Sequence, residues 1–204
     1  MQKEGLIQFL EKLAPKNLAE DWDNVGLLLG KREGEVRRVY LCLDVDSFAV
    51  KKAIEEGCDF ILSHHPFIFK GIKAVTGEDL QGKKIITLIE NGISVFSMHT
   101  NFDSVKRGMA DLVAETLEWK KEGVMEAVPS TTDGEEQGIG FYTHLDKALS
   151  CADLARYVKE KCALPYIEYF DSGRKIRKLA VCPGSGRSFL SSLPSDVDAY
   201  ISGD

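Results

Sequence analysis

The sequence has few cysteines, no long apolar run and no excess of positive charge. Its five cysteines are odd in number and form no C-x-x-C pair, which argues against a disulfide framework or a structural zinc site. No apolar run approaches the roughly 20 residues that cross a bilayer, and the N-terminal residues show no signal peptide. The net charge of −6 gives no electrostatic footprint for nucleic acid or an anionic membrane. We therefore expect a cytoplasmic protein with reduced thiols that binds neither membranes nor nucleic acid.

The order of apolar segments predicts the fold class. Hydrophobic residues make up 44% of the 204 residues, which is enough for a buried core. Apolar runs at 36–43, 59–63 and 93–98 are typical of strands, and residues 47–57 and 83–91 between them have helical spacing. This alternation predicts an α/β fold with parallel βαβ units. The polar, turn-rich residues 129–138 are the best candidate for a boundary, so we expect one lobe over 1–128 and a second over 129–204.

The end of the chain repeats the first βαβ unit. Residues 179–182 match residues 39–42, and residues 197–202 match residues 58–63, with a short predicted helix between the strands in both copies. Two similar βαβ-containing lobes, with mixed sheets flanked by helices, would explain the repeat. The alternative is that any two βαβ units look alike. Ser63 is followed by two histidines but Ser202 only by Gly203 and Asp204, so we expect the second lobe to be incomplete at its C-terminus.

Three of the four histidines lie at the ends of two predicted strands. His64 and His65 follow the strand at 59–63, His99 follows the strand at 93–98, and Asp103 comes four residues later. Open α/β sheets place ligand sites at the carboxyl ends of their strands. Imidazole and carboxylate ligands together suit zinc, iron, manganese, cobalt or nickel. The pattern predicts a metal site formed by these four residues. The alternative is that the histidines are ordinary core or surface residues.

Two arrangements of the metal site remain open. Adjacent side chains of an extended chain point in opposite directions, so His64 and His65 can share one ion only if the backbone turns. Pro66 favours such a turn. Otherwise each histidine serves a different ion of a two-metal site, with Asp103 as a possible bridge. Two such ions would lie roughly 3.5–4 Å apart and activate a water.

Four other residues have weaker signals. Asp44 ends the strand beside the first histidine strand, so we expect it either to orient an imidazole or to begin a helix. Trp22 and Asp23 are expected to anchor a turn, with a position at the edge of a pocket as the alternative. His144 has no other potential ligand beside it, and we interpret it as an exposed residue.

Several motifs in fixed order carry a family resemblance. They are Trp22-Asp23-Asn24-Val25-Gly26-Leu27, Leu43-Asp44-Val45-Asp46, Ser63-His64-His65-Pro66, His99-Thr100-Asn101-Phe102-Asp103, Cys182-Pro183-Gly184-Ser185-Gly186 and Tyr200-Ile201-Ser202-Gly203-Asp204. In these the sequence resembles the NIF-three-like family, also described as GTP cyclohydrolase type 2 homologues or dinuclear metal centre hexameric proteins. The family also has a histidine and a glutamate beyond the Ser-Gly-Asp motif, and both would fall past Asp204. The chain is therefore interpreted as truncated at its C-terminus.

The resemblance implies a function as well as a fold. It implies two similar α/β lobes around a two-metal site, a ring-shaped homohexamer, and two divalent transition-metal ions per subunit in the complete family site. His64, His65, His99 and Asp103 would be the ligands of the first lobe. We therefore expect a metal-dependent hydrolase that acts on a small-molecule or nucleotide-like substrate. The alternative is a non-catalytic metal-binding or regulatory scaffold, because no residue stands out as a general base.

Overall fold

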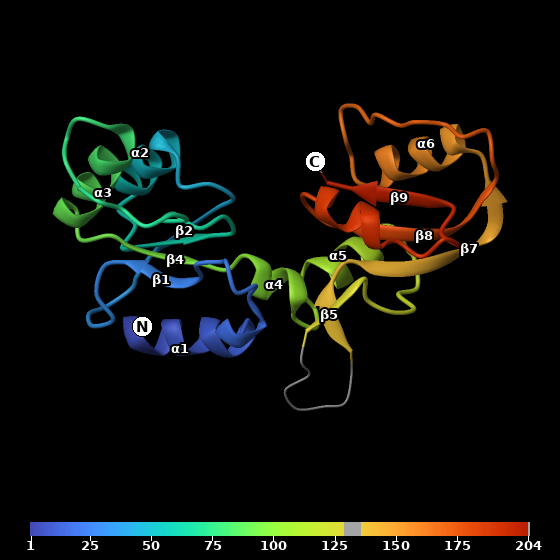
Figure 1. The fold of residues 1–204 in the computed structure, drawn as a ribbon. Helices are drawn as coiled ribbons and strands as arrows, with labels where there is room; N and C mark the ends of the chain where they lie inside the picture. The colour runs from blue at the N-terminus through green and yellow to red at the C-terminus, as the bar shows by residue number, and fades with distance from the viewer. Residues whose placement is uncertain (129–135, 204) are drawn as a thin grey trace. The chain divides into compact units, whose positions relative to one another are not determined.

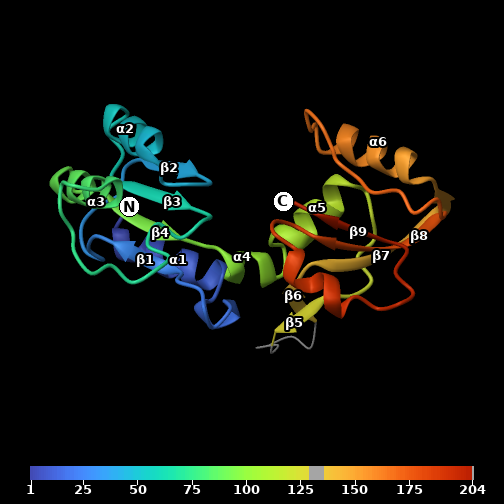
Figure 2. The ribbon, with the colours of Figure 1, turned by 45° about the horizontal axis from the view of Figure 1, so that its top comes forward.

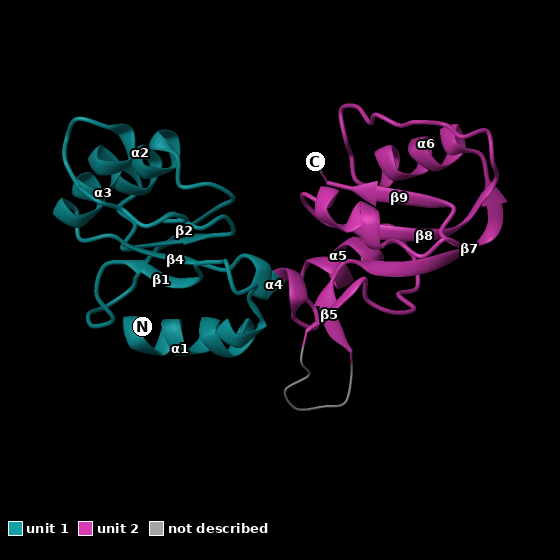
Figure 3. Ribbon diagram, in the orientation of Figure 1, with its two compact units in different colours: residues 1–102 teal, residues 103–204 magenta. Residues whose placement is uncertain are grey.

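The computed structural model describes residues 1–128 and 136–203, which form two compact units, residues 1–102 and 103–204 (Figure 3). The sequence placed the boundary at residues 128/129. The structure instead divides the chain between Phe102 and Asp103. The physical reason is packing, because Ala110, Ala114 and Leu117 are buried in the core of the second unit. The turn-rich residues 129–135, on which the predicted boundary rested, lie outside the described residues.

Unit 1 is a mixed four-stranded sheet flanked by helices. Its elements are α1 (Lys3–Leu13), the 3-10 helix η1 (Lys16–Leu18), β1 (Gly26–Leu29), β2 (Val39–Cys42), α2 (Ser47–Glu55), β3 (Phe60–Ser63), α3 (Leu80–Glu90) and β4 (Ser94–Ser97). The strand order is β1-β4-β3-β2, with β2, β3 and β4 parallel and β1 antiparallel to β4. Helices α2 and α3 lie on one face of the sheet and α1 on the other (Figure 1). The expected α/β fold and its parallel βαβ unit are confirmed.

The helices α2 and α3 each bury one apolar face in the core of unit 1. Residues spaced three apart do this: Val50 and Ala53 in α2, Ile85 and Leu88 in α3. They pack with Ile61 of β3 and Val95 of β4 in one hydrophobic cluster. Each helix begins at an aspartate whose side chain accepts a hydrogen bond from a backbone N–H of the first turn. This packing fixes the two strands whose carboxyl ends carry the histidines.

Unit 2 combines a three-stranded sheet with a short hairpin. Helix α4 (Thr100–Ser104) runs across the boundary, and α5 (Met109–Thr116), β5 (Glu126–Val128), β6 (Gln137–Ile139), β7 (Phe141–Leu149), α6 (Cys151–Lys161), β8 (Ile176–Cys182), the 3-10 helix η2 (Arg187–Ser192) and β9 (Ala199–Ser202) follow. The sheet order is β7-β8-β9, with β7 antiparallel and β9 parallel to β8, and β5 pairs with β6 (Figure 2). Among the helices that the structure describes, none has the length and apolarity needed to cross a membrane.

The internal repeat is visible in the register of the two parallel strand pairs. Cys42 of β2 lies opposite Ser63 of β3, and Cys182 of β8 lies opposite Ser202 of β9. A carboxylate ties each pair together at its start: Asp59 accepts hydrogen bonds from the N–H groups of residues 37 and 38, and Asp198 from those of residues 177 and 178. The connecting helix differs, because α2 is an α-helix and η2 a 3-10 helix. The predicted repeat is therefore confirmed in its parallel strand pairs, and the connection in the second copy is a 3-10 helix rather than an α-helix.

We expect the two aspartates of the repeat to stabilise their units unequally. Asp59→Ala removes a carboxylate that is 20% exposed, leaves two backbone N–H groups without their acceptor, and should lower the free energy of unfolding by about 1–2 kcal/mol. Asp198→Ala should act in the same direction but less, because Asp198 is exposed. Urea denaturation would measure both, with the exposed Asp146→Ala as control. An Asp59→Ala protein as stable as the control would contradict the structural role.

Candidate metal centre

Two parallel strands deliver three histidines to one edge of the sheet in unit 1. Ser63, the last residue of β3, lies opposite Ser97, the last residue of β4. His64 follows β3 directly, and His99 comes two residues after β4. The ring centroid of His64 lies 5.3 Å from that of His65 and 5.3 Å from that of His99. The His65 and His99 centroids are 5.8 Å apart. One ligand atom from each ring lies within 4.8 Å of the other two. The strand ends thus bring together the three histidines that the sequence singled out.

The backbone bends at His64 and His65, which lets adjacent side chains meet. Both residues lie in a bend rather than in extended strand. The hydroxyl of Ser63 donates a hydrogen bond of 2.9 Å to the His65 carbonyl and shares one of 2.8 Å with the Ser97 hydroxyl. These bonds tie the bend to the neighbouring strand. The turn that the sequence required for a shared ion is therefore present.

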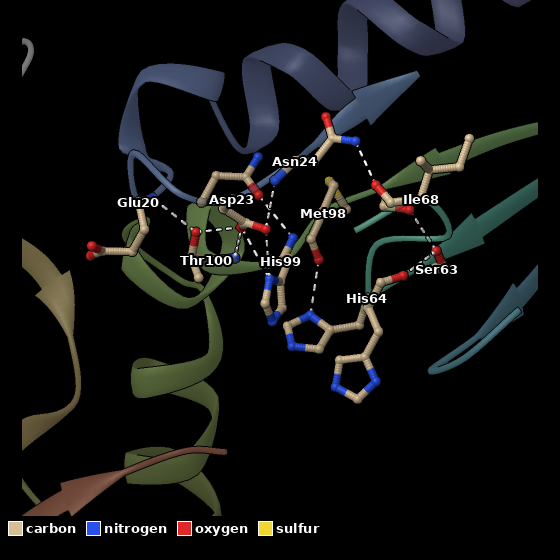
Figure 4. A network of polar contacts seen from close by, with 12 residues as sticks. Glu20, Asp23, Asn24, Ser63, His64, Ile68, Met98, His99 and Thr100 are labelled. Atoms are coloured by element: carbon tan, nitrogen blue, oxygen red, sulfur yellow. Dashed lines mark hydrogen bonds and ion pairs between the residues drawn. The ribbon is translucent and has the colours of Figure 1, made fainter. Parts of the chain in front are cut away.

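His64 is half-buried at the end of β3. Its Nδ1 lies 2.9 Å from the carbonyl oxygen of Met98 (Figure 4). Burial lowers the pKa of the His64 imidazole, and the neighbouring His99 and His65 rings lower it further, against the opposing effect of the Met98 bond. A lowered pKa favours the neutral imidazole, which is the form that binds metal.

His99 is held by the buried carboxylate of Asp23, which comes from the N-terminal part of unit 1. Its Nδ1 lies 3.0 Å from each carboxylate oxygen of Asp23, whose side chain has no exposed surface (Figure 4). Thr100 donates to the same carboxylate from its backbone N–H at 3.1 Å and its hydroxyl at 2.6 Å. Burial would raise the pKa of Asp23, but the hydrogen bonds from His99, Thr100 and Asn24 outweigh it and lower the pKa to about 2. Asp23 is therefore a fixed negative charge behind His99.

His65 has the most exposed position and an exposed partner. Its Nδ1 lies 2.8 Å from a carboxylate oxygen of Asp44, and the side chains are 45% and 61% exposed. The interpretation that Asp44 orients an imidazole is thus supported by a direct contact. Helix α2 begins instead at Asp46, whose side chain accepts a hydrogen bond from Ala49.

The hydrogen bonds of the three rings fix their tautomers in the same way. Each Nδ1 faces a carbonyl or carboxylate oxygen, which can only accept, so Nδ1 carries the proton. Nε2 of each ring then keeps the lone pair that binds a metal ion. Imidazoles oriented by such oxygen acceptors are typical of metal sites in proteins. The donor set fits a divalent transition metal.

The structure also shows what the sequence missed. Asp23 was predicted to anchor a turn, with a pocket edge as the alternative, and it turns out to orient a histidine. Its weak local signal was an aspartate in a turn-forming stretch before Gly26. Asp103 lies half-buried in α4, and its role as a ligand stays a prediction. His144 lies apart from the cluster in sequence and pairs with Glu122 at 2.6 Å.

Fold and site together define a class of α/β protein that carries a histidine cluster at the carboxyl ends of parallel strands. Comparison with known proteins identifies the family. The model of the family Duf34/NIF3 (NGG1p interacting factor 3) matches residues 1–204, and the chain belongs to this family.

Known relatives match the chain over its whole length. It is 36% identical to a Clostridium perfringens protein named GTP cyclohydrolase 1 type 2 homolog, covering 100% of this chain and 78% of the relative. A Clostridium acetobutylicum protein of the same name is 37% identical, with 76% of its length covered. Among solved structures, reduced HcgD from Methanocaldococcus jannaschii is 30% identical with a TM-score of 0.78, covering 100% of this chain and 79% of that one. A Staphylococcus aureus protein, 26% identical and covered over 80%, gives a TM-score of 0.86.

Proposed function

We propose that this protein is a metal-dependent hydrolase that acts on a small or nucleotide-like substrate. The observation that carries the proposal is the convergence of His64, His65 and His99, each of which offers a ligand atom within 4.8 Å of the other two. A bound divalent transition metal supplies Lewis acidity and lowers the pKa of a coordinated water. Asp103 is the fourth proposed ligand, and a second ion per subunit follows from the family resemblance. The nucleotide-like substrate is supported by the name of the relatives, GTP cyclohydrolase 1 type 2 homolog.

The chain's own residues have defined roles in this proposal. Asp23 holds the His99 ring in one orientation and keeps its proton on Nδ1. The Met98 carbonyl does the same for His64, and Asp44 for His65. Pre-oriented rings need no rearrangement when a ligand is bound, which favours a rigid site.

A second candidate is a non-catalytic metal-binding or regulatory scaffold. One observation favours it: Asp23 and Asp44, the carboxylates that contact the cluster in the described part of the chain, are both engaged by imidazoles. Neither is poised to act as a general base toward a substrate.

We further propose that the protein forms a homo-oligomer, a hexamer by family resemblance, and that it is located in the cytoplasm. Light scattering after size exclusion would measure the oligomer.

Turnover by metal-loaded protein separates the two candidates. Protein stripped with a chelator is reloaded with zinc, manganese, iron(II), cobalt or nickel, and loading is confirmed by elemental analysis. We expect hydrolysis of p-nitrophenyl phosphate or GTP by at least one loaded form, and none by the stripped protein. Full loading without hydrolysis of phosphoesters, nucleotides or amides would favour the scaffold.

A further inference from the structure

Two large aromatic side chains stand exposed beside the histidine cluster. Trp22 is 59% exposed and Phe69 is 47% exposed. Their centroids lie 5.9 Å apart with the rings at 72° to each other. The Trp22 centroid also lies 6.1 Å from that of His99, at 73°. Both contacts are T-shaped, and with 59% of its surface exposed Trp22 stays largely open to solvent despite them.

Hydrogen bonds hold both aromatic residues in place through their neighbours. Asp23, next to Trp22, is fixed to His99 and Thr100. Asn24 donates from its side-chain amide to the carbonyl of Ile68, next to Phe69, at 2.5 Å (Figure 4). The turn that carries Trp22 is therefore tied to both the histidine cluster and the loop that carries Phe69. A rigid aromatic surface loses little conformational entropy when a ligand binds to it.

Core packing does not account for this placement of Trp22. The other tryptophan of the chain, Trp119, is only partly exposed and stacks on Tyr157, with centroids 5.8 Å apart and planes at 12°. It packs against the hydrophobic core of unit 2. Trp22 has no such parallel partner among the described residues. The centroid of its exposed indole lies 6.1 Å from that of His99, a proposed metal ligand. Exposed aromatic groups placed in this way are typical of ligand-binding surfaces.

We propose that Trp22 and Phe69 form an aromatic ledge that binds the planar heteroaromatic ring of the substrate and selects for it. The inference rests on the proposed function, because it names the class of substrate that the histidine cluster acts on. A ring stacked on the Trp22 indole lies beside His99, so its edge reaches the cluster. Stacking tolerates many heterocycles because each has a π-face, and the ledge therefore selects for a flat ring rather than for one base.

Tryptophan fluorescence can report this binding directly. The chain has two tryptophans, so Trp119→Phe leaves Trp22 as the only one. The protein is titrated with GTP, with guanosine and with inorganic triphosphate. We expect saturable quenching of Trp22 by GTP and guanosine and none by triphosphate. Equal quenching by GTP and triphosphate would show an anion site and overturn the proposal. Failure of GTP or of guanosine to quench Trp22 would also overturn it.

Substitutions on the ledge test its contribution to binding. Trp22→Leu and Phe69→Leu should each weaken GTP binding on the order of tenfold, measured by equilibrium dialysis, because base–aromatic stacking is lost. The matched control Trp119→Leu should bind GTP like the unaltered protein. GTP affinities unchanged in both ledge variants would overturn the proposal, and stacking by an aromatic side chain of a protein partner would then be the competing use of the surface.

The design separates failure of the ledge from failure of the proposed function. Neither ledge side chain is a proposed ligand, so both variants should retain the metal content of the unaltered protein in elemental analysis. The preference for ring-bearing over ring-free phosphoesters is then compared in the unaltered protein and in Trp22→Leu. If metal-dependent hydrolysis shows the same preference in both proteins, the ledge alone is overturned. If the proposed function were wrong, elemental analysis would instead find no metal in the unaltered protein.

Discussion

Replacing His64 by alanine is expected to lower the affinity for the bound metal by more than about 100-fold. Changes to groups that only orient a ligand already cost 10–100-fold in metal affinity, and His64 is proposed to bind the ion itself. The effect should be large because the His64 ring faces both other rings, with centroids 5.3 Å away. Elemental analysis after desalting, and competition with a chromophoric chelator, would measure the loss.

His144 provides the matched control for this experiment. It is an exposed histidine in β7 of unit 2, with its ring paired to Glu122. His144→Ala also removes one imidazole from the chain, but at a position outside the histidine cluster. We therefore expect unchanged metal content. If His64→Ala keeps its metal, or if His144→Ala loses as much, the histidine cluster is not where the protein binds metal.

The histidine cluster was predictable from sequence because its geometry follows from local patterns. His64 and His99 each come at the end of a short apolar run, and such runs are typical of buried strands. Parallel strands end at the same edge of a sheet, so residues that follow them meet in space. The same reasoning placed Asp44 near the histidines, and its contact with His65 bears this out. The expectation of a metal came from the same pattern, and the family resemblance added the expectation of a ring-shaped homohexamer.

Asp23 could not be assigned from the sequence because its role depends on a non-local contact. It is separated from His99 by 76 positions. Its local sequence resembles that of any turn, and the antiparallel pairing of β1 with β4 is what places it behind His99. The unit boundary was missed for a related reason. Packing of Ala110 and Leu117 into the second core decides it, and helical periodicity cannot say which sheet a helix packs against.

Asp23→Asn is expected to be the more damaging of two matched changes behind the histidines. The carboxylate now accepts hydrogen bonds from four donors: the His99 ring, the Thr100 N–H and hydroxyl, and the Asn24 N–H. An amide at this position has one oxygen for these donors, and its NH₂ group faces a donor. Because the side chain has no exposed surface, water cannot replace the lost bonds. We expect about a 10–100-fold loss of metal affinity. The free energy of unfolding of the metal-free protein should fall by about 1–3 kcal/mol.

Asp44→Asn tests whether burial is what makes Asp23 important. Both aspartates accept a hydrogen bond from the Nδ1 of a histidine, but Asp44 is 61% exposed and no backbone group donates to it in the described hydrogen bonds. An asparagine can still accept from His65 through its amide oxygen, and water can solvate the rest. We therefore expect less than about a tenfold loss of metal affinity, with stability changed by no more than about 0.5 kcal/mol. Chelator competition and urea denaturation in EDTA give both quantities. If Asp44→Asn proved as damaging as Asp23→Asn, orientation of His65 rather than the buried charge behind His99 would control the site.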